Sequence, residues 1–178
     1  MNDWMQTYTG RVFWPLKPRA EDVNINDIAH ALSNLCRFGG HSQAFYSVAQ
    51  HSVLVSKIVP PKDAMWGLMH DAGEAYVNDL ISPIKHTQGA TWYRDAEARV
   101  MRAVCRRFGL SLKQPQSVDE ADLVMLATEK RDLMWPVIRR WASLPAPRSQ
   151  KVFPWSPKRA EKEFLTRAHK LGLCEVPA

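Results

Sequence analysis

Apolar residues recur every three or four positions along most of the chain, which is the spacing of one face of an α-helix. Between residues 24 and 40, for example, Ile28, Leu32 and Leu35 form one such stripe. The pattern predicts a succession of helices, and their expected limits are Asn24 or Asn26 to Gly39–Gly40, Ser47 to Pro60–Pro61, 62–80, Thr91 to Gly109, Ser117 to Pro136, and Ser156–Pro157 to Leu171.

The residues at the starts of these segments are typical of helix N-termini. Asparagine and serine side chains accept hydrogen bonds from the first free backbone N–H groups, so the expected N-caps are Asn24 or Asn26 for the first helix, Ser47 and Ser156. Ser117 and Glu120 form an S-x-x-E pattern, which predicts a capping box. These signals place the helix starts more firmly than periodicity alone.

Two stretches of the chain do not have the helical spacing. β-Branched and aromatic residues flank Thr9–Gly10, which predicts a short hairpin over about residues 5–15, since glycine accepts the positive φ of a tight turn. Residues 143–157 contain four prolines and are expected to form a loop. No repeat, low-complexity tract or long linker divides the chain. We therefore expect one all-α domain over residues 1–178 with a small N-terminal hairpin.

Composition limits the class of protein and its partners. The net charge is +6 and the pI is about 9.4, which suits either nucleic acid or a small polyanion such as a nucleotide. No stretch approaches the ~18 apolar residues that span a bilayer, and the N-terminus has no secretory signal pattern. Cys36, Cys105 and Cys174 are far apart, as expected for free thiols in a reducing cytoplasm. We expect a cytoplasmic protein with no membrane partner.

Four polar residues fall inside apolar helical runs, where core side chains would be expected: His51, His70, Asp71 and Asp122. A lone buried histidine is more often a hydrogen-bonded core residue than a metal ligand, and Asp122 alone could be a first-turn residue favoured by the helix dipole. Burying a carboxylate, however, costs several kcal/mol unless it is paired or bound to a cation. Two imidazoles and two carboxylates from three helices would suit zinc, manganese, iron or cobalt.

The segments around these residues resemble the metal motifs of a known superfamily. "AQHSVLVS", "LMHDAGEAYVNDLISPIK" and "DEADLVMLATE" are similar to the motifs of the HD-domain phosphohydrolases, over roughly residues 5–140. Within that superfamily, "HDAGEAYVNDLISPIK" resembles the bacterial 5′-deoxynucleotidases. The stretches "TYTGRVFWPL" and "DIAHALSNLCRFGGH" resemble phage-type proteins, among them dATP triphosphohydrolases. The resemblance implies an HD-domain helical bundle.

The resemblance also implies roles for individual acids and ligands. His51, His70, Asp71 and Asp122 would be the metal ligands, and Glu74 would handle the attacking water. Asp79 would assist the leaving group or hold a further metal. The spacing gives independent support for Glu74, because a residue four after His70 lies on the same face of one helix. The small neighbours Ala72, Gly73 and Ala75 would leave open space beside it, although an exposed helix acid is the simpler reading.

Three further residues match substrate-binding positions of the resembled family. Arg37 and Lys85 match residues that hold substrate phosphates, and a guanidinium can grip two phosphate oxygens at once. The simpler readings are a helix C-terminal charge for Arg37 and a solvent-facing loop cation for Lys85. Phe38 stands where the deoxynucleotidases have tryptophan, a residue that helps to exclude ribonucleotides, so the preference for deoxy sugars is less secure here.

The expected function is therefore a metal-dependent phosphohydrolase acting on deoxynucleotides, with dATP hydrolysis to deoxyadenosine and triphosphate as the favoured reaction. Zn²⁺ or Co²⁺ is the expected cofactor, with Mn²⁺ or Mg²⁺ as alternatives. The resemblance implies a homo-oligomer, a dimer or a hexamer, with no stable nucleic-acid partner. A 5′-deoxynucleoside monophosphatase remains a near alternative. A non-catalytic nucleic-acid-binding module with a structural metal is a more distant one, and hydrolysis of cyclic dinucleotides or (p)ppGpp is disfavoured by the motifs.

Overall fold

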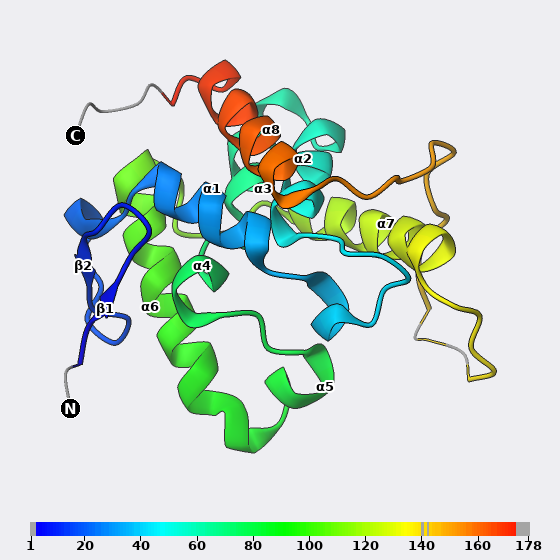
Figure 1. The fold of residues 1–178 in the computed structure, drawn as a ribbon, viewed down its shortest axis with the longest axis horizontal. Helices are drawn as coiled ribbons and strands as arrows, with labels where there is room; N and C mark the ends of the chain where they lie inside the picture. The colour runs from blue at the N-terminus through cyan, green and yellow to red at the C-terminus, as the bar shows by residue number, and fades with distance from the viewer. Residues whose placement is uncertain (1–2, 140, 142, 174–178) are drawn as a thin grey trace.

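The computed structural model describes residues 3–139, 141 and 143–173 and confirms an all-α fold with a small N-terminal hairpin (Figure 1). The longer helices enclose two apolar clusters, and shorter helical segments connect them. In chain order the α-helices are α1 (Ile25–Asn34), α2 (Val48–Ile58), α3 (Ala64–Met69), α4 (Glu74–Val77), α5 (Ser82–Lys85), α6 (Thr91–Phe108), α7 (Gln116–Leu133) and α8 (Pro157–Lys170). Single 3₁₀ turns occupy Ala20–Asp22, Arg37–Gly40, Pro61–Asp63 and Gln88–Ala90.

The N-terminal hairpin packs on the helical core at one edge of the molecule (Figure 1). Its strands, β1 (Met5–Gln6) and β2 (Val12–Phe13), are antiparallel, with Met5 opposite Phe13. Gly10 has a φ of 81°, as the predicted turn requires. Phe13 is fully buried and stacks on Tyr76 of α4, with ring centroids 3.9 Å apart. The hairpin is therefore anchored directly behind the segment that carries Glu74.

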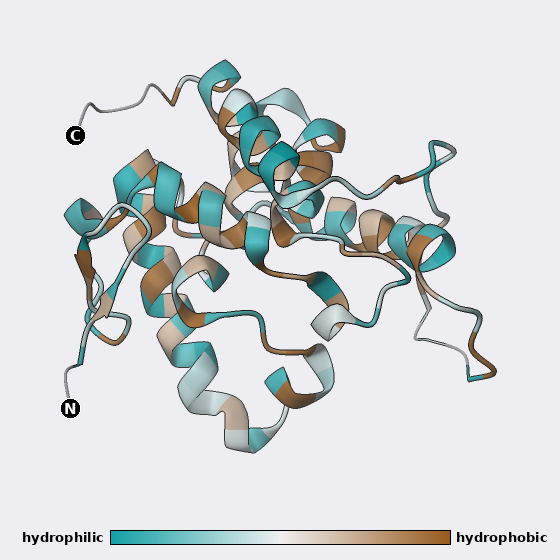
Figure 2. Ribbon diagram, viewed as in Figure 1, coloured by the Kyte–Doolittle hydropathy of each residue, from teal (hydrophilic) through white to brown (hydrophobic). Residues whose placement is uncertain are grey.

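The main core lies where α1, α2, α3 and α8 meet. α2 packs against α3 and α8, and α1 packs against α8. Leu32, Val53, Leu68 and Phe164, one from each of these helices, are fully buried in one apolar cluster. Figure 2 shows apolar residues gathered between these helices, whereas the outer face of α8 is hydrophilic. Burying side chains of this size contributes roughly 1.5–3 kcal/mol each, which holds α2 and α3 in a fixed relation.

The contact between α2 and α3 is close because Gly67 has no side chain. A Cβ atom built there would lie 3.0 Å from the Cα of Ser56 on α2 and 3.1 Å from Cγ2 of Val59. His51 lies on α2 and His70 directly follows α3. This close approach therefore helps to determine the distance between the two histidines.

The predicted helix caps at three positions are confirmed. The side chains of Asn24, Ser47 and Ser156 each accept a hydrogen bond from a backbone N–H group in the first turn of the following helix. Gly109 ends α6 in the left-handed conformation, with a φ of 66°. These termini follow from local chemistry that the sequence displays directly.

The single helix predicted over residues 62–80 is wrong. The chain instead forms α3, a turn at residues 70–73 and the one-turn α4. Ala72 N–H donates to the Met69 carbonyl and Glu74 N–H to the Asp71 carbonyl, both across three residues instead of four. This tightening turns the chain at the predicted metal motif. His70 and Glu74 therefore flank a turn and do not share one helix face.

Two other boundaries also differ from the predictions. The first helix ends at Asn34, because Leu35 is extended and Cys36 bridges to Ser47, so Arg37 lies outside the helix in a separate 3₁₀ turn. The capping box at Ser117 is wrong as well. Pro115 is the N-cap residue of α7, and the Ser117 hydroxyl donates instead to an Asp63 carboxylate oxygen at 2.6 Å.

The proline-rich stretch 143–156 is a connection without helix or strand, as predicted. It is tied to the helices by side chains: Arg148 N–H donates to the Thr128 hydroxyl, and the buried Gln50 side chain binds the backbone of Phe153 and Trp155.

Cys36 and Cys105 are free thiols, and Cys174 lies outside the described residues. None of the helices in the described ranges is long and apolar enough to cross a membrane.

Replacing Gly67 by alanine tests the close packing of α2 and α3. The added methyl group must push Ser56 and Val59 away, so we expect Gly67→Ala to lower the free energy of unfolding by about 1–3 kcal/mol. Urea denaturation followed by circular dichroism measures this loss. Gly89→Ala is the matched control, because a Cβ there would meet only the Thr87 hydroxyl, at 3.9 Å. Equal stability of the two variants would contradict the packing assigned to Gly67.

Candidate metal centre

His51 occupies the centre of the candidate site. It lies in the first turn of α2, which Ser47 caps, and it is fully buried. Its Nδ1 atom lies 2.6 Å from a carboxylate oxygen of Glu129, while Nε2 faces the other candidate ligands. The ring is thus oriented from behind by Glu129.

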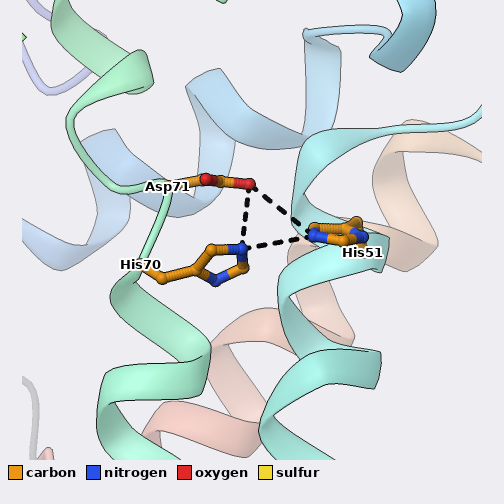
Figure 3. Close-up of side chains that lie close together, drawn as sticks. All are labelled: His51, His70 and Asp71. Carbon is orange, nitrogen blue, oxygen red and sulfur yellow. Dashed lines mark hydrogen bonds and ion pairs between the residues drawn. The ribbon is translucent and has the colours of Figure 1, made fainter. Parts of the chain in front are cut away.

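His70 and Asp71 approach from the turn after α3. His70 Nδ1 donates to the Gly67 carbonyl at 3.0 Å, which directs Nε2 toward His51. The two Nε2 atoms are 3.2 Å apart, and Asp71 Oδ2 lies 3.2 Å from His70 Nε2 and 3.8 Å from His51 Nε2. Figure 3 shows the three side chains pointing toward a common centre. One donor atom from each lies within 4.8 Å of the others, so this buried group can hold a metal ion.

Asp122 joins the group from α7. Its Oδ1 atom lies 3.0 Å from His51 Nε2, on a side chain that is 40% exposed. The structure thus places donor atoms of the other three predicted ligands within 3.8 Å of His51 Nε2. Asp122 contacts His51 but is not part of the group of three whose donor atoms all lie within 4.8 Å of one another. Two donors that each lie about 2.1 Å from one metal are roughly 3.0–3.4 Å apart at tetrahedral or octahedral angles. The separations of 3.0 and 3.2 Å fit such a shell, whereas the 3.8 Å between Asp71 Oδ2 and His51 Nε2 is longer.

The electrostatics of the group favour a positive charge at its centre. Burial and Arg37 would lower the pKa of His51, but Glu129 and the hydrogen bonds to Asp122 and Glu129 outweigh them and raise it to about 9. Burial would raise the pKa of Asp71, but His70, His51 and Arg37 hold it far below its usual range. These neighbours keep the Asp71 carboxylate ionised, so it would stabilise a cation placed between it and the imidazoles.

Glu129 is a site residue that the sequence analysis missed. It is fully buried on α7, seven residues or two turns after Asp122. Its Oε1 atom accepts hydrogen bonds from His51 and from the Tyr46 hydroxyl, and Oε2 accepts one from Arg37 Nε at 3.1 Å. Burial would raise its pKa, but Arg37 and His51 lower it overall. The spacing of Asp122, Met125 and Glu129 along one helix face was the signal that could have found it.

Glu74 and Asp79, the two acids that follow the turn, lie close enough to the candidate ligands that burial and Asp71 together raise the pKa values of both. Glu74 is 7% exposed, and its Oε2 atom is buried without a hydrogen-bond partner. Burial, Asp71 and Asp79 all raise the pKa of Glu74. Burial raises the pKa of Asp79, while Arg37 opposes the change. An unpartnered buried carboxylate oxygen indicates a place where a water or ligand atom is required.

The structure does not confirm the open space predicted beside Glu74. α6 packs closely on Gly73, so the space beside it is occupied: a Cβ there would lie 3.1 Å from the Met101 side chain. Ala72 is fully buried. Ala75 lines a cavity of about 350 Å³ together with the hairpin and α1, and Glu74 is not among the residues that line it.

The predicted phosphate-binding residues lie near the acids but are paired with carboxylates. Arg37 contacts Glu129 and has an Nη atom 3.7 Å from Asp71. Its backbone N–H donates to the Tyr46 carbonyl, which ties the arginine to the chain entering α2. Lys85 Nζ lies 2.6 Å from Glu97 of α6. Both cations are thus held in place, and Lys85 is not a freely solvated loop residue.

Phe38 adopts an uncommon backbone conformation. Its φ is 57°, in the left-handed region, and its ring lies 5.4 Å from the Arg37 guanidinium carbon. Gly39, which follows it, would place a Cβ 3.4 Å from the Ile81 side chain. The turn that carries Arg37 and Phe38 is therefore packed beside the segment between Asp79 and Lys85. The strained conformation marks this turn as one that the surrounding structure enforces.

Comparisons with known proteins give relatives but no activity. The chain is 40% identical over 175 residues to the uncharacterized protein YfdR of Escherichia coli K12, covering 95% of this chain and 96% of YfdR. It is 35% identical over 127 residues to the uncharacterized protein RCAP_rcc00048 of Rhodobacter capsulatus, covering 66% of this chain and 64% of that protein. No protein-family model matches the chain.

Removal of one central ligand tests the metal centre without reference to any reaction. His70→Ala deletes one of the two imidazole nitrogens that face each other. Loss of a residue that only supports a ligand typically lowers metal affinity about 10–100-fold, and loss of the ligand itself should cost at least as much. We therefore expect the affinity for Zn²⁺ or Co²⁺ to fall by more than about 100-fold. Isothermal titration calorimetry on the metal-free protein measures this. The exposed His86 supplies the control, His86→Ala, which should bind as the parent does. Unchanged binding by His70→Ala would rule out the site.

Proposed function

We propose that this chain, which belongs to the family of the Escherichia coli protein YfdR, is a metal-dependent phosphohydrolase acting on deoxynucleotides. The observation that carries the proposal is the group formed by His51, His70 and Asp71, together with the acid Glu74, whose pKa is raised by burial and by the nearby Asp71. Asp122 contacts His51 in this group, and Glu74 Oε2 is buried without a hydrogen-bond partner. A structural metal needs the four ligands alone. A buried acid next to them, together with two fixed cations, is what hydrolysis of a phosphate ester requires.

The four ligands would hold one divalent cation, and the mixed nitrogen and oxygen donor set favours Zn²⁺ or Co²⁺, with Mn²⁺ or Mg²⁺ as alternatives. Such a cation polarises a phosphoryl oxygen and lowers the pKa of a water molecule from 15.7 toward ~7. The separations of 3.0–3.2 Å from His51 to Asp122 and to His70, and from His70 to Asp71, support a shared cation, and Asp71 lies 3.8 Å from His51.

Glu74 would act as the general base. Its carboxylate accepts a proton from the attacking water, and its raised pKa brings it closer to the neutral range in which such a base works best. The oxygen of that water forms a bond to the α-phosphorus of the substrate, and the bond from phosphorus to the 5′ oxygen breaks. Asp79 would supply the proton that the leaving 5′ oxygen takes up, which its own raised pKa favours.

Arg37 and Lys85 would bind the phosphate oxygens. Arg37 can keep its Nε contact with Glu129 and turn both Nη atoms to the substrate, because its fork has donors on two sides. Lys85 would exchange Glu97 for a phosphate oxygen. Phe38, held against the Arg37 guanidinium, would contact the nucleoside.

The favoured substrate is dATP, converted with water to deoxyadenosine and triphosphate, and this choice rests on the family resemblance of the sequence motifs. The same resemblance underlies the proposal of a dimer or hexamer in the cytoplasm with no stable nucleic-acid partner. One observation favours a 5′-deoxynucleoside monophosphatase instead. Arg37 and Lys85 are both already paired with carboxylates, so they offset less of the charge that a triphosphate brings.

A substrate panel tests the activity and separates these two reactions. The protein is loaded with Co²⁺, Mn²⁺, Zn²⁺ or Mg²⁺ and incubated with all dNTPs, NTPs and dNMPs, and the products are resolved by anion-exchange chromatography. We expect dATP to yield triphosphate in a single step, whereas a monophosphatase would release orthophosphate from dNMPs. Glu74→Gln should retain the metal and lose about 10²–10⁴-fold in turnover.

Glu120→Gln controls for the loss of a carboxylate, because Glu120 is exposed on α7. It should hydrolyse the substrate at the parental rate. A parent protein that is loaded with each metal and hydrolyses nothing would defeat the enzyme proposal, as would a Glu74→Gln variant with full activity.

A further inference from the structure

Glu129 contacts two parts of the candidate site at the same time. Its Oε1 atom lies 2.6 Å from His51 Nδ1 and 2.8 Å from the Tyr46 hydroxyl, and its Oε2 atom lies 3.1 Å from Arg37 Nε. The residue is fully buried, so water does not compete for these contacts. Each carboxylate oxygen therefore serves a different neighbour: one the imidazole, the other the guanidinium.

The contact with His51 determines which nitrogen can bind a metal. A carboxylate without a proton can only accept, so the Nδ1 atom that faces Glu129 carries the hydrogen. The other nitrogen, Nε2, is therefore the one that would bind a metal ion, and it faces His70 and Asp122, 3.2 and 3.0 Å away. A carboxylate behind a ligating imidazole also makes that imidazole a stronger donor.

The contact with Arg37 determines where the guanidinium points. Nε is the donor nearest to the arginine stem, so holding it on Glu129 fixes the plane of the group. One Nη atom then lies 3.7 Å from Asp71, a candidate ligand. The Glu129 carboxylate therefore determines how far the Arg37 guanidinium, which would bind phosphate, lies from the candidate metal site.

The geometry points to Glu129 as the positioning residue that couples the metal ligand His51 to the phosphate-binding Arg37. The role of Arg37 in this assignment rests on the proposed function. The support that Glu129 gives to His51 follows from their hydrogen bond alone. Asp122 and Glu129 lie two turns apart on α7, so one helix would supply both a ligand and the support of another ligand.

Glu129→Gln tests the coupling, because the amide keeps the shape of the side chain but replaces an acceptor oxygen by an NH₂ group. Calorimetry on the metal-free protein should show Zn²⁺ affinity reduced about 10–100-fold. The visible spectrum of the Co²⁺-loaded protein should shift. The affinity of the metal-loaded protein for inorganic triphosphate should also fall, because the NH₂ group faces Arg37 Nε–H. Glu120→Gln, on the same helix, should match the parent in all three measurements.

A purely structural role for Glu129 would give a different result. Glu129→Gln would then lower the melting temperature, while its folded fraction would bind Zn²⁺ within twofold of the parent and show the parental Co²⁺ spectrum, which overturns the assignment. Should Glu129→Gln not fold, Tyr46→Phe decides instead. It keeps the carboxylate but removes one of its hydrogen bonds, and we expect Zn²⁺ affinity to fall about tenfold, with parental affinity as the contrary result.

These measurements separate the coupling from the enzyme proposal. A parent that binds Zn²⁺ but hydrolyses nothing would remove the proposed function, while the loss of metal affinity in Glu129→Gln would still establish the positioning of His51. Full activity in the parent together with unchanged metal and triphosphate binding in Glu129→Gln would remove the coupling alone.

Discussion

The mutual repulsion of closely spaced donor atoms is the constraint on which the site depends. Two imidazole nitrogens face each other at 3.2 Å, a carboxylate oxygen of Asp71 lies 3.2 Å from that of His70, and one of Asp122 lies 3.0 Å from that of His51. Lone pairs so arranged in a buried place are unfavourable unless a positive charge lies between them. In the metal-free protein that charge is a proton on His51, whose pKa is raised to about 9. Under the proposed function, a divalent cation would take the place of that proton and bind the same donor atoms.

The fold supplies this convergence through packing and one break in a helix. Gly67 lets α3 approach α2 closely enough for His70 to face His51. The turn at residues 70–73 then directs Asp71 to the same centre and places Glu74 beyond it. α7 adds Asp122 and, two turns later, Glu129. The site therefore depends most on how α2, α3 and α7 pack together, while the hairpin and α6 pack on the outside of this junction.

Much of this was predictable because it depends on local chemistry. Side-chain capping at Asn24, Ser47 and Ser156, the glycine terminus of α6 and the glycine turn of the hairpin all follow from the residues themselves. The four candidate ligands stood out because charged or polar groups interrupt apolar stripes.

The features that were missed depend on tertiary contacts. Residues 62–80 keep a helical pattern, yet the chain turns at His70, where α6 packs on Gly73. Ser117 has the sequence of a capping box, but Asp63 on a distant segment binds its hydroxyl. Glu129 resembles a solvent-facing helix acid until Tyr46, His51 and Arg37 are placed around it.

The most direct measurement is anomalous diffraction at the cobalt edge from crystals of the Co²⁺-loaded protein. We expect one strong peak about 2.1 Å from Nε2 of both His51 and His70 and in contact with the carboxylates of Asp71 and Asp122. A cobalt ion bound elsewhere, with these four side chains unliganded, would contradict the assignment of the metal centre.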